Sequence, residues 1–276
     1  MIVQAALAMA VKVLKQAGIE EPVRDARLLM ASCMKISVSR LTLHAHAELE
    51  DAAQVVFFGD IGQRAVRTPV SHLLGYRDFY GRRFTVTPDV LDPRGDTETL
   101  IEAALAVQFD SVLDLGTGSG CILVTLLAER VAATGTGVDV SKCAVCVAER
   151  NARKLGVWDR CALEVSDWFE SVGGSYDLIV SNPPYISLNE MASLLPELAH
   201  EPRTALTDEC DGLTAYRTIT AGASANLRQG GWLMVEIGPT QGDAVIAMFE
   251  ASGLSKLEIR IDLNGRNRVV LGQLPH

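Results

Sequence analysis

The run Val112-Leu113-Asp114-Leu115-Gly116-Thr117-Gly118-Ser119-Gly120, followed by Cys121-Ile122-Leu123-Val124-Thr125-Leu126-Leu127, decides the fold class. A short apolar strand here leads into a glycine turn and then into a helix. Glycines permit positive φ and a close approach of the backbone to a ligand. From Ser111 onwards, predicted strands and helices alternate, which is typical of a mostly parallel sheet. We therefore predict an α/β domain with a ligand site at this turn.

The glycine turn has two possible ligands, a dinucleotide and S-adenosylmethionine. Its spacing is Gly-x-Gly-x-Gly, whereas dinucleotide sites usually read Gly-x-Gly-x-x-Gly. Asp114 would repel a pyrophosphate but suits an ammonium or sulfonium group. Asp139 ends the next predicted strand, where a carboxylate can accept hydrogen bonds from two ribose hydroxyls. An NAD enzyme would use the same acid, so the turn and Asp114 favour S-adenosylmethionine and Asp139 fits both.

A second motif, Ser181-Asn182-Pro183-Pro184-Tyr185, follows the apolar run Tyr176-Asp177-Leu178-Ile179-Val180. The run predicts a buried strand, which places Asn182 at the sheet edge where ligands bind in such folds. Each proline fixes its own φ and restricts the residue before it, so the loop is stiff. A stiff loop can hold carbonyl oxygens and an aromatic face against a planar NH2 group. On its own the motif fits equally well a proline-bounded strand exit with a packed tyrosine.

Two further features lie between these motifs. Asp167-Trp168 follows the predicted strand 161–165, where it can hydrogen-bond an adenine amino group and cover its ring. An edge tryptophan that caps the core fits these two residues equally well. Cys143 and Cys146 form a single Cys-x-x-Cys without a second pair, so we interpret them as a helix face rather than a metal or redox site. We predict no metal site.

The chain divides into three predicted parts. Residues 1–75 show helical apolar spacing and no nucleophile, metal or phosphate chemistry, so we predict a small helical domain used for docking. Between about 69 and 95 the pattern changes, and alternation with a turn at Gly81 predicts a β-hairpin; we assign residues 76–95 to this linker between the two domains. Residues 96–276 form the α/β domain, and Asp96 is expected to cap its first helix.

Composition limits the partners. The net charge is −9, and residues 1–75 hold eight Lys or Arg and seven Asp or Glu, so the α/β part carries the negative charge. An acidic domain argues against broad nucleic-acid binding. No apolar run reaches the length of a membrane span, and no signal peptide precedes the first helix. Six scattered cysteines suit a reducing compartment, so we expect a cytoplasmic protein. We also expect a monomer.

Taken together, the motifs resemble those of the HemK/PrmC family, the protein-(glutamine-N5) methyltransferases that act on peptide-chain release factors. The resemblance covers nearly the full length of the chain, because the matching stretches recur in order. They are 74–81, 96–98, 114–120, 166–169, 181–186 and 201–206. One departure is that the family usually reads Ile-Pro-Arg-Pro-Asp-Thr-Glu where this chain has Asp92-Pro93-Arg94-Gly95-Asp96-Thr97-Glu98. The loss of a proline loosens that turn.

The resemblance implies a class I S-adenosylmethionine-dependent methyltransferase sheet, Rossmann-like, of seven strands with the last antiparallel. It implies the glutamine of the Gly-Gly-Gln motif in class I release factors as substrate, with S-adenosylhomocysteine as product. The expected cofactor-binding residues are Asp114, Gly116, Thr117, Gly118, Ser119, Gly120, Asp139, Asp167, Trp168 and Asn182. Asn182, Pro183, Pro184 and Tyr185 are expected to hold the substrate amide, with Asn182, Pro183 and Tyr185 serving catalysis.

Three alternatives stay open at this point. Enzymes that methylate a ribosomal-protein glutamine share nearly all the motifs, and only the N-terminal domain could separate the two substrates. Adenine-N6 DNA methyltransferases also carry Asn-Pro-Pro-Tyr and flip out their base, but this chain lacks a basic, aromatic-rich target-recognition segment. The third is an S-adenosylmethionine-fold module that binds without catalysis, against which the intact Asn182 and glycine turn argue.

Overall fold

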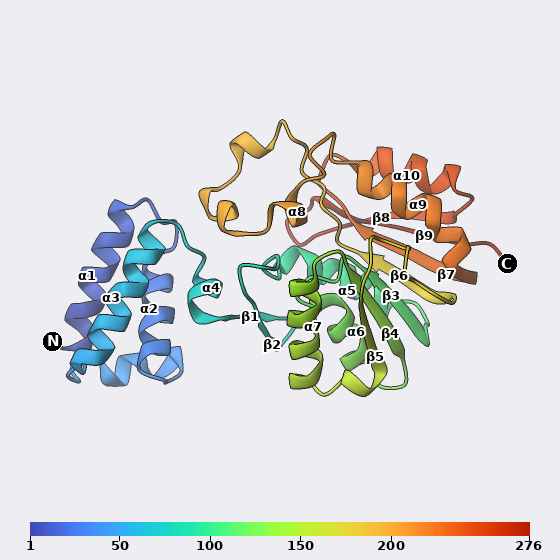
Figure 1. The fold of residues 1–276 in the computed structure, drawn as a ribbon. Helices are drawn as coiled ribbons and strands as arrows, with labels where there is room; N and C mark the ends of the chain where they lie inside the picture. The colour runs from blue at the N-terminus through green and yellow to red at the C-terminus, as the bar shows by residue number, and fades with distance from the viewer. The chain divides into compact units, whose positions relative to one another are not determined.

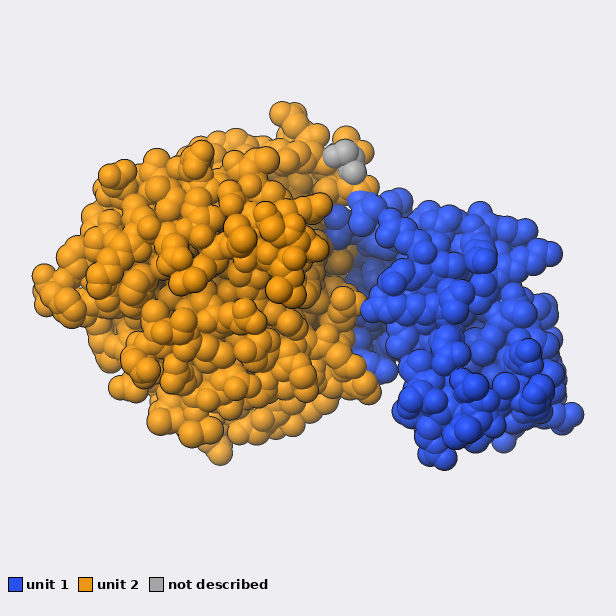
Figure 2. Space-filling view, turned by 180° about the vertical axis from the view of Figure 1, so that it is seen from behind, with its two compact units in different colours: residues 1–76, 195–200 blue, residues 77–194, 201–276 orange. Residues whose placement is uncertain are grey.

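The computed structural model describes residues 1–276, apart from the side chain of Ser193. The chain forms two compact units, which Figure 2 shows in different colours. The first comprises Met1–Tyr76 together with Leu195–His200, and the second comprises Arg77–Leu194 and Glu201–His276. No helix among the described residues combines the length and hydropathy that crossing a membrane requires.

The first unit is a helical bundle, as the sequence predicts. Helix α1 shows why: Val3, Ala6, Ala10 and Leu14 recur at helical spacing and are all fully buried. Helix α2 starts with Pro22, whose fixed φ suits the first helical turn. The elements are α1 (Val3–Gln16), α2 (Pro22–Cys33), the 3-10 helix η1 (Val38–His44), α3 (Asp51–Ala65) and α4 (Val70–Leu74).

The segment Leu195–His200 joins this bundle although it is remote in sequence. Glu197 accepts hydrogen bonds from Arg64 (3.1 Å) and Arg67 (3.2 Å). Arg64 also donates to Asp25 at 2.7 Å, and both of these side chains are nearly buried. A buried charge needs a partner to offset its loss of hydration. The ion pairs of Glu197 with Arg64 and Arg67 therefore hold the segment against α3, and the Arg64–Asp25 pair links this contact to α2.

A β-hairpin forms within the predicted residues 76–95. Strands β1 (Tyr76–Phe79) and β2 (Arg82–Thr85) pair, whereas Val70–Leu74 is the short helix α4. Gly75 ends that helix with a φ of 72°, a left-handed position that glycine adopts without strain. The hairpin is tied to helix α7 (Lys142–Lys154) by the fully buried Asn151. Its amide accepts from the Thr85 N–H (2.7 Å) and donates to the Thr85 carbonyl (2.9 Å), as a neighbouring strand would.

The prediction that Asp96 caps a helix is wrong. Asp96 lies inside the 3-10 turn η2 (Gly95–Thr97), and helix α5 (Glu98–Leu105) begins after it without a side-chain cap. The Asp96 carboxylate instead lies 3.0 Å from the guanidinium of Arg268, which is only 5% exposed. An ion pair with a nearly buried cation stabilises the carboxylate more than hydrogen bonds at a helix N-terminus do. This pair fixes η2 to the strand that carries Arg268.

The second unit contains the predicted seven-stranded sheet, with strand order β5-β4-β3-β6-β7-β9-β8. Strands β3 to β7 are parallel, and the last strand along the chain, β9, is antiparallel to both neighbours. The strands are β3 (Ser111–Leu115), β4 (Thr134–Asp139), β5 (Cys161–Val165), β6 (Tyr176–Ser181), β7 (Leu227–Glu236), β8 (Ser255–Ile261) and β9 (Asn267–Gln273).

Helices cover both faces of this sheet (Figure 1). Successive strand residues point to opposite faces, so Leu178 and Val180 pack into the core beneath α5 and α6 (Cys121–Glu129) while Ile179 packs beneath α9 (Thr214–Asn226) and α10 (Gly242–Ala251). The near-continuous apolar strands follow from burial on both faces. The sequence pattern and the observed layers therefore agree.

Two glycines let α6 approach the sheet closely. A Cβ at Gly135 would lie 2.5 Å from the Leu123 side chain, and one at Gly137 would lie 2.9 Å from it. Both glycines are buried on β4 and, two residues apart, face the same side. Helix α6 follows the glycine turn, so this close packing also sets the position of that turn.

We expect Gly135→Ala to lower the free energy of unfolding of the second unit by about 1–2 kcal/mol. Alanine reduces the conformational entropy of the unfolded chain, which favours folding, but the steric clash of its Cβ in the folded state is larger. Urea unfolding followed by tryptophan fluorescence measures this. Gly173→Ala is the matched control in the same unit: its added Cβ would meet no atom within 4 Å, so the change should stay within about 0.5 kcal/mol. Equal stability of the two variants would contradict the packing argument.

Candidate active site

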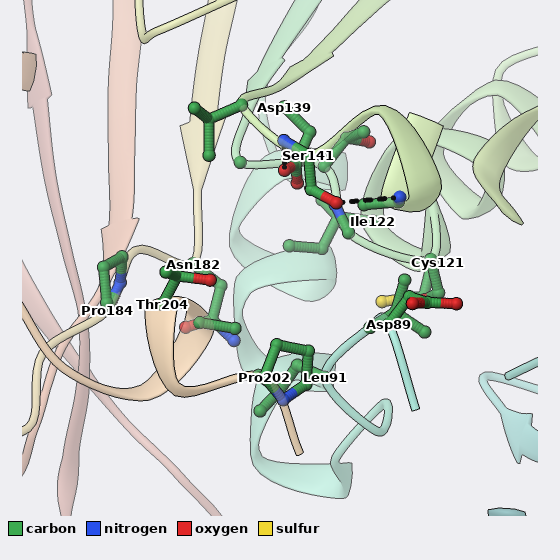
Figure 3. A pocket seen from close by; sticks show the side chains of 18 of the residues that line it. Asp89, Leu91, Cys121, Ile122, Asp139, Ser141, Asn182, Pro184, Pro202 and Thr204 are labelled. Atoms are coloured by element: carbon green, nitrogen blue, oxygen red, sulfur yellow. Dashed lines mark hydrogen bonds between the residues drawn. The ribbon is translucent and has the colours of Figure 1, made fainter. Parts of the chain in front are cut away.

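One cavity at the carboxyl edge of the sheet brings the predicted motifs together. Leu115 pairs with Val138 on one side and with Ser181 on the other, so the ends of β4, β3 and β6 meet there. Figure 3 shows Asp139 and Ser141 on one side of the cavity and Asn182 and Pro184 on another. The predicted site residues in its lining are Gly116, Thr117, Gly118, Ser119, Asp139, Asp167, Trp168, Asn182 and Pro184.

The glycine turn is fixed from below by the neighbouring strand. The N–H groups of Gly116 and Thr117 both donate to the Val138 carbonyl at 2.9 Å. Gly116 and Gly118 have φ values of 71° and 55°, left-handed conformations that are strained for a residue with a side chain. Gly120 starts α6 at a φ of 77°; it does not line the cavity, and a Cβ there would lie 3.1 Å from the Cβ of Ala148.

Asp139 connects this turn to the next helix. Its Oδ2 accepts from the Gly118 N–H and its Oδ1 from the Ser141 N–H, both at 2.9 Å. Ser141 then caps α7 by accepting from the Ala144 N–H, the dashed line in Figure 3. Burial raises the pKa of Asp139, while the two backbone hydrogen bonds lower it in part. The carboxylate is oriented before any ligand binds, as ribose recognition requires.

Asp114 lies beneath the turn and is fully buried, outside the lining of the cavity. Its Oδ2 accepts a 2.7 Å hydrogen bond from the Thr117 hydroxyl. Burial raises the pKa of Asp114 to about 7, and the Thr117 hydrogen bond lowers it in part. The carboxyl thus supports the turn, and its direct contact with a cofactor stays a prediction.

Asp167 and Trp168 form part of the cavity wall in a strained turn. Trp168 has a φ of 47°, which is uncommon for a bulky residue. The Ser166 hydroxyl stabilises this conformation, because it donates to the Trp168 carbonyl (3.0 Å) and accepts from the Ser171 N–H (2.9 Å). Asp167 is exposed. Both residues line the cavity, and the Trp168 side chain also packs against the hydrophobic core.

Asn182 follows β6 directly and is the polar centre of the second motif. Its Nδ2 donates to the Thr97 hydroxyl at 3.3 Å. Its Oδ1 is buried and has no hydrogen-bond partner among the described residues. A buried acceptor without a partner is costly, so this oxygen is available to a donor that enters the cavity.

Pro183 and Tyr185 do not line the cavity, although both belong to the motif. Burial raises the pKa of Tyr185 to about 12, so its hydroxyl stays protonated. Gln241 holds the Tyr185 backbone: its Nε2 donates to the carbonyls of Tyr185 (2.8 Å) and Gly212 (3.1 Å), and its Oε1 accepts from the Gly238 N–H (2.9 Å).

Sequence reasoning missed Gln241 and Thr97. Gln241 lies 56 residues after Tyr185, and no spacing rule connects a loop glutamine to a distant carbonyl. Thr97 belongs to the stretch 96–98, but it contacts Asn182, which lies 85 residues away in the sequence. Knowledge of which strands are neighbours would have been needed to place Thr97 beside Asn182.

The departure from the family pattern lies in the cavity wall. Asp92 lines the cavity and pairs with Arg77 at 3.7 Å. Arg94, two residues on, pairs with Glu201 at 3.3 Å, and the Glu201 side chain is only 6% exposed. The charge at Asp92 is thus offset within the wall. The opposite segment also contributes lining, through Pro202, Thr204 and Ala205.

Comparisons with known proteins agree with this geometry. The family described as "PrmC N-terminal domain" matches residues 5–75, and the "Methyltransferase small domain" family matches residues 91–211. A protein of Cereibacter sphaeroides with the name "Release factor glutamine methyltransferase" is 53% identical over 271 residues, 98% of each chain. The chain belongs to the release factor glutamine methyltransferase family. A Rhodospirillum rubrum protein of the same name is 44% identical over 94% of this chain and 81% of its own.

Solved structures support the fold of this family member. A methyltransferase from Pyrococcus furiosus superposes with a TM-score of 0.56 at 14% identity, over 72% of this chain and 91% of that chain. The hMettl16 catalytic domain, in complex with the MAT2A 3′UTR hairpin 6, gives a TM-score of 0.58 at 16% identity over 82% of each chain. The predicted class I, Rossmann-like methyltransferase fold is confirmed.

The cavity fits S-adenosylmethionine, the methyl donor that the sequence predicts. The positive-φ glycines allow a ligand to approach the backbone, and Asp139 offers a carboxylate whose orientation is fixed by two hydrogen bonds. The Trp168 ring and the Asp167 carboxylate suit an adenine ring with an amino group. Asn182 lines the same cavity.

The buried Asp114 carboxyl predicts a pH-dependent stability. Unfolded Asp ionises near pH 4, while folded Asp114 has a pKa of about 7. Between these values the folded chain binds the extra proton, so the free energy of unfolding falls as pH rises, by up to about 1.4 kcal/mol per pH unit. Asp114→Asn should make this slope shallower between pH 5 and 7.

Urea unfolding at pH 5, 6 and 7 measures the slope, because all three tryptophans, at positions 158, 168 and 232, report on the second unit. Asp159→Asn replaces an exposed aspartate of that unit and serves as the control, which should keep the wild-type slope. A wild-type slope in Asp114→Asn would show that the pKa of this carboxyl is not raised in the folded protein.

Proposed function

We propose that this protein transfers a methyl group from S-adenosylmethionine to the side-chain nitrogen, N5, of the glutamine in the Gly-Gly-Gln motif of class I release factors. Support comes from full-length relatives that bear the release factor glutamine methyltransferase name. The roles of Asn182, Pro183, Pro184 and Tyr185 toward the glutamine are part of the proposal. So is the division into a docking domain, a hairpin linker and a catalytic domain.

The observation that carries the proposal is the buried Asn182 Oδ1, which has no partner among the described residues. A primary amide has two N–H donors, and an acceptor of this kind binds one of them. The Pro183 carbonyl is proposed to accept the other. The two prolines restrict the loop backbone, so both acceptors keep their relative positions. An amide NH2 group therefore matches the site better than a hydroxyl, which has one donor.

The chemistry asks the protein chiefly for orientation. An amide nitrogen is a weak nucleophile because its lone pair is delocalised into the carbonyl group. When bound, S-adenosylmethionine supplies an electrophilic methyl group on a positively charged sulfur. Asn182 and Pro183 would fix the N–H bonds so that the nitrogen lone pair points along the line of displacement, and Tyr185 would keep the amide plane aligned. Such positioning contributes up to ~7–11 kcal/mol.

The balance of the reaction needs no strong base. A nitrogen–carbon bond forms as the carbon–sulfur bond breaks, and the sulfur keeps the electron pair. The nitrogen becomes acidic only as it gains the methyl group, and its proton then leaves along the hydrogen bond to Asn182 Oδ1 or to the Pro183 carbonyl. The acceptors that orient the amide therefore also serve the departing proton.

The alternatives differ in substrate rather than in chemistry. A ribosomal-protein glutamine would present the same NH2 group to the site. An adenine amino group would too, but the net charge of −9 disfavours a DNA partner. The monomeric state and the cytoplasmic location stay predictions. A methyl-transfer assay with a release factor, ribosomal proteins and DNA separates the three possible substrates.

We expect label from S-adenosylmethionine on the Gly-Gly-Gln glutamine of a purified class I release factor, and none on ribosomal proteins or duplex DNA. Asn182→Ala should reduce kcat about 100-fold, the order seen when one preorganised hydrogen-bonding group is removed from an active site. Calorimetry with S-adenosylhomocysteine provides the control that this variant still binds cofactor. Label on DNA or on a ribosomal protein alone would reject the release-factor substrate.

Tyr185 tests the stacking role. Tyr185→Phe keeps the ring and should retain kcat within about threefold, because the hydroxyl lies 3.5 Å from Glu236, the far limit of a hydrogen bond. Tyr185→Ala removes the ring and should lower kcat by about tenfold. Steady-state kinetics with the release factor measures both. Equal losses in the two variants would assign the role to the hydroxyl instead.

A further inference from the structure

The orientation of the Asn182 amide depends on one side-chain hydrogen bond. Its Nδ2 donates to Thr97 Oγ1 at 3.3 Å, and its Oδ1 is the buried acceptor described above. An amide turned by 180° about its last bond would present N–H groups to the substrate and would repel the glutamine NH2. A hydroxyl can donate as well as accept. Thr97 therefore selects one orientation only if its own proton is engaged elsewhere.

Glu236 is the neighbour that can accept this proton, because its Oε2 is buried and has no hydrogen-bond partner among the described residues. It ends strand β7, next to β6, and is 1% exposed. Burial raises the pKa of Glu236 to about 7, and a hydrogen bond from Thr97 together with the nearby Arg268 and Arg94 lowers it in part. A carboxyl group that accepts from the Thr97 hydroxyl leaves only oxygen lone pairs facing Asn182.

Thr97 itself has little freedom. It is 2% exposed and ends the turn η2, which the Asp96–Arg268 ion pair at 3.0 Å fixes to β9. Arg268 is also held by Asp262 at 3.0 Å. Thr97 is thus held by contacts with strands β7 and β9, and it lines the cavity beside Asn182.

We propose that Thr97 is a positioning residue: with its proton given to Glu236, its hydroxyl accepts the Asn182 Nδ2–H and turns Asn182 Oδ1 toward the substrate amide. The chain runs in one direction, from Asn182 to Thr97 to Glu236. Through this chain Thr97 acts on the substrate by way of Asn182, whose oxygen it leaves free to accept. The inference rests on the proposed function, since it deepens the role of Asn182 in that reaction.

The test compares Thr97→Val, which removes the hydroxyl at nearly constant volume, with Thr97→Ser, which keeps it. Thr97→Val should lower kcat for release-factor methylation by about 3- to 10-fold, the effect expected for one hydrogen bond. The KM for S-adenosylmethionine and the Kd for S-adenosylhomocysteine should stay within twofold. Thr97→Ser should restore kcat to within twofold of wild type.

Thr218→Val is the matched control, because the Thr218 hydroxyl is exposed and bonds only the Thr214 carbonyl of its own helix among the contacts seen in the described chain. It should keep wild-type kcat. Circular dichroism establishes that each variant is folded, and Thr97→Ala replaces Thr97→Val if the latter is not. Wild-type kcat in the variant without a hydroxyl, or an equal loss in Thr97→Ser, overturns the inference. A wild-type protein that methylates no release factor instead overturns the proposed function.

Discussion

The site depends above all on the hydrogen-bond register of three parallel strands. Because Leu115 pairs with both Val138 and Ser181, the carboxyl ends of β3, β4 and β6 reach the same edge of the sheet. The Val138 carbonyl then accepts from two successive N–H groups of the glycine turn. A shift of one residue in either pairing would turn the side chains of a whole strand to the other face. The glycine turn, Asp139 and Asn182 line one cavity because this register brings the ends of their strands together.

Two carboxyl groups near that edge are almost completely buried. Asp114 supports the glycine turn from below, and Glu236 lies behind the Asn-Pro-Pro-Tyr loop; burial raises the pKa of each to about 7. Burial of such groups is unfavourable unless neighbours supply hydrogen bonds. In return, fixed partners hold the two loops in place before ligands arrive, and preorganised groups need no rearrangement during reaction.

The sequence predicted the architecture because its signals are local. Alternating strands and helices, the glycine turn and the prolines of 183–184 each depend on residues close together in the chain, and the structure places them as expected. One local prediction was wrong: Asp96 pairs with Arg268 instead of capping a helix. Contacts across long sequence distances, such as Gln241 to Tyr185 and Asn182 to Thr97, left no pattern to detect. Their geometry exists only once the strands are ordered.

The segment Leu195–His200 has a consequence for how this protein can be divided. The chain passes from one unit to the other after residues 76, 194 and 200, so the helical unit is not a continuous piece of sequence. A polypeptide that ends at residue 76 would leave Arg64 and Arg67 without the Glu197 carboxylate. The part that the sequence suggests could be detached is therefore completed by residues from the middle of the catalytic half. Modular exchange between relatives would have to carry both pieces together.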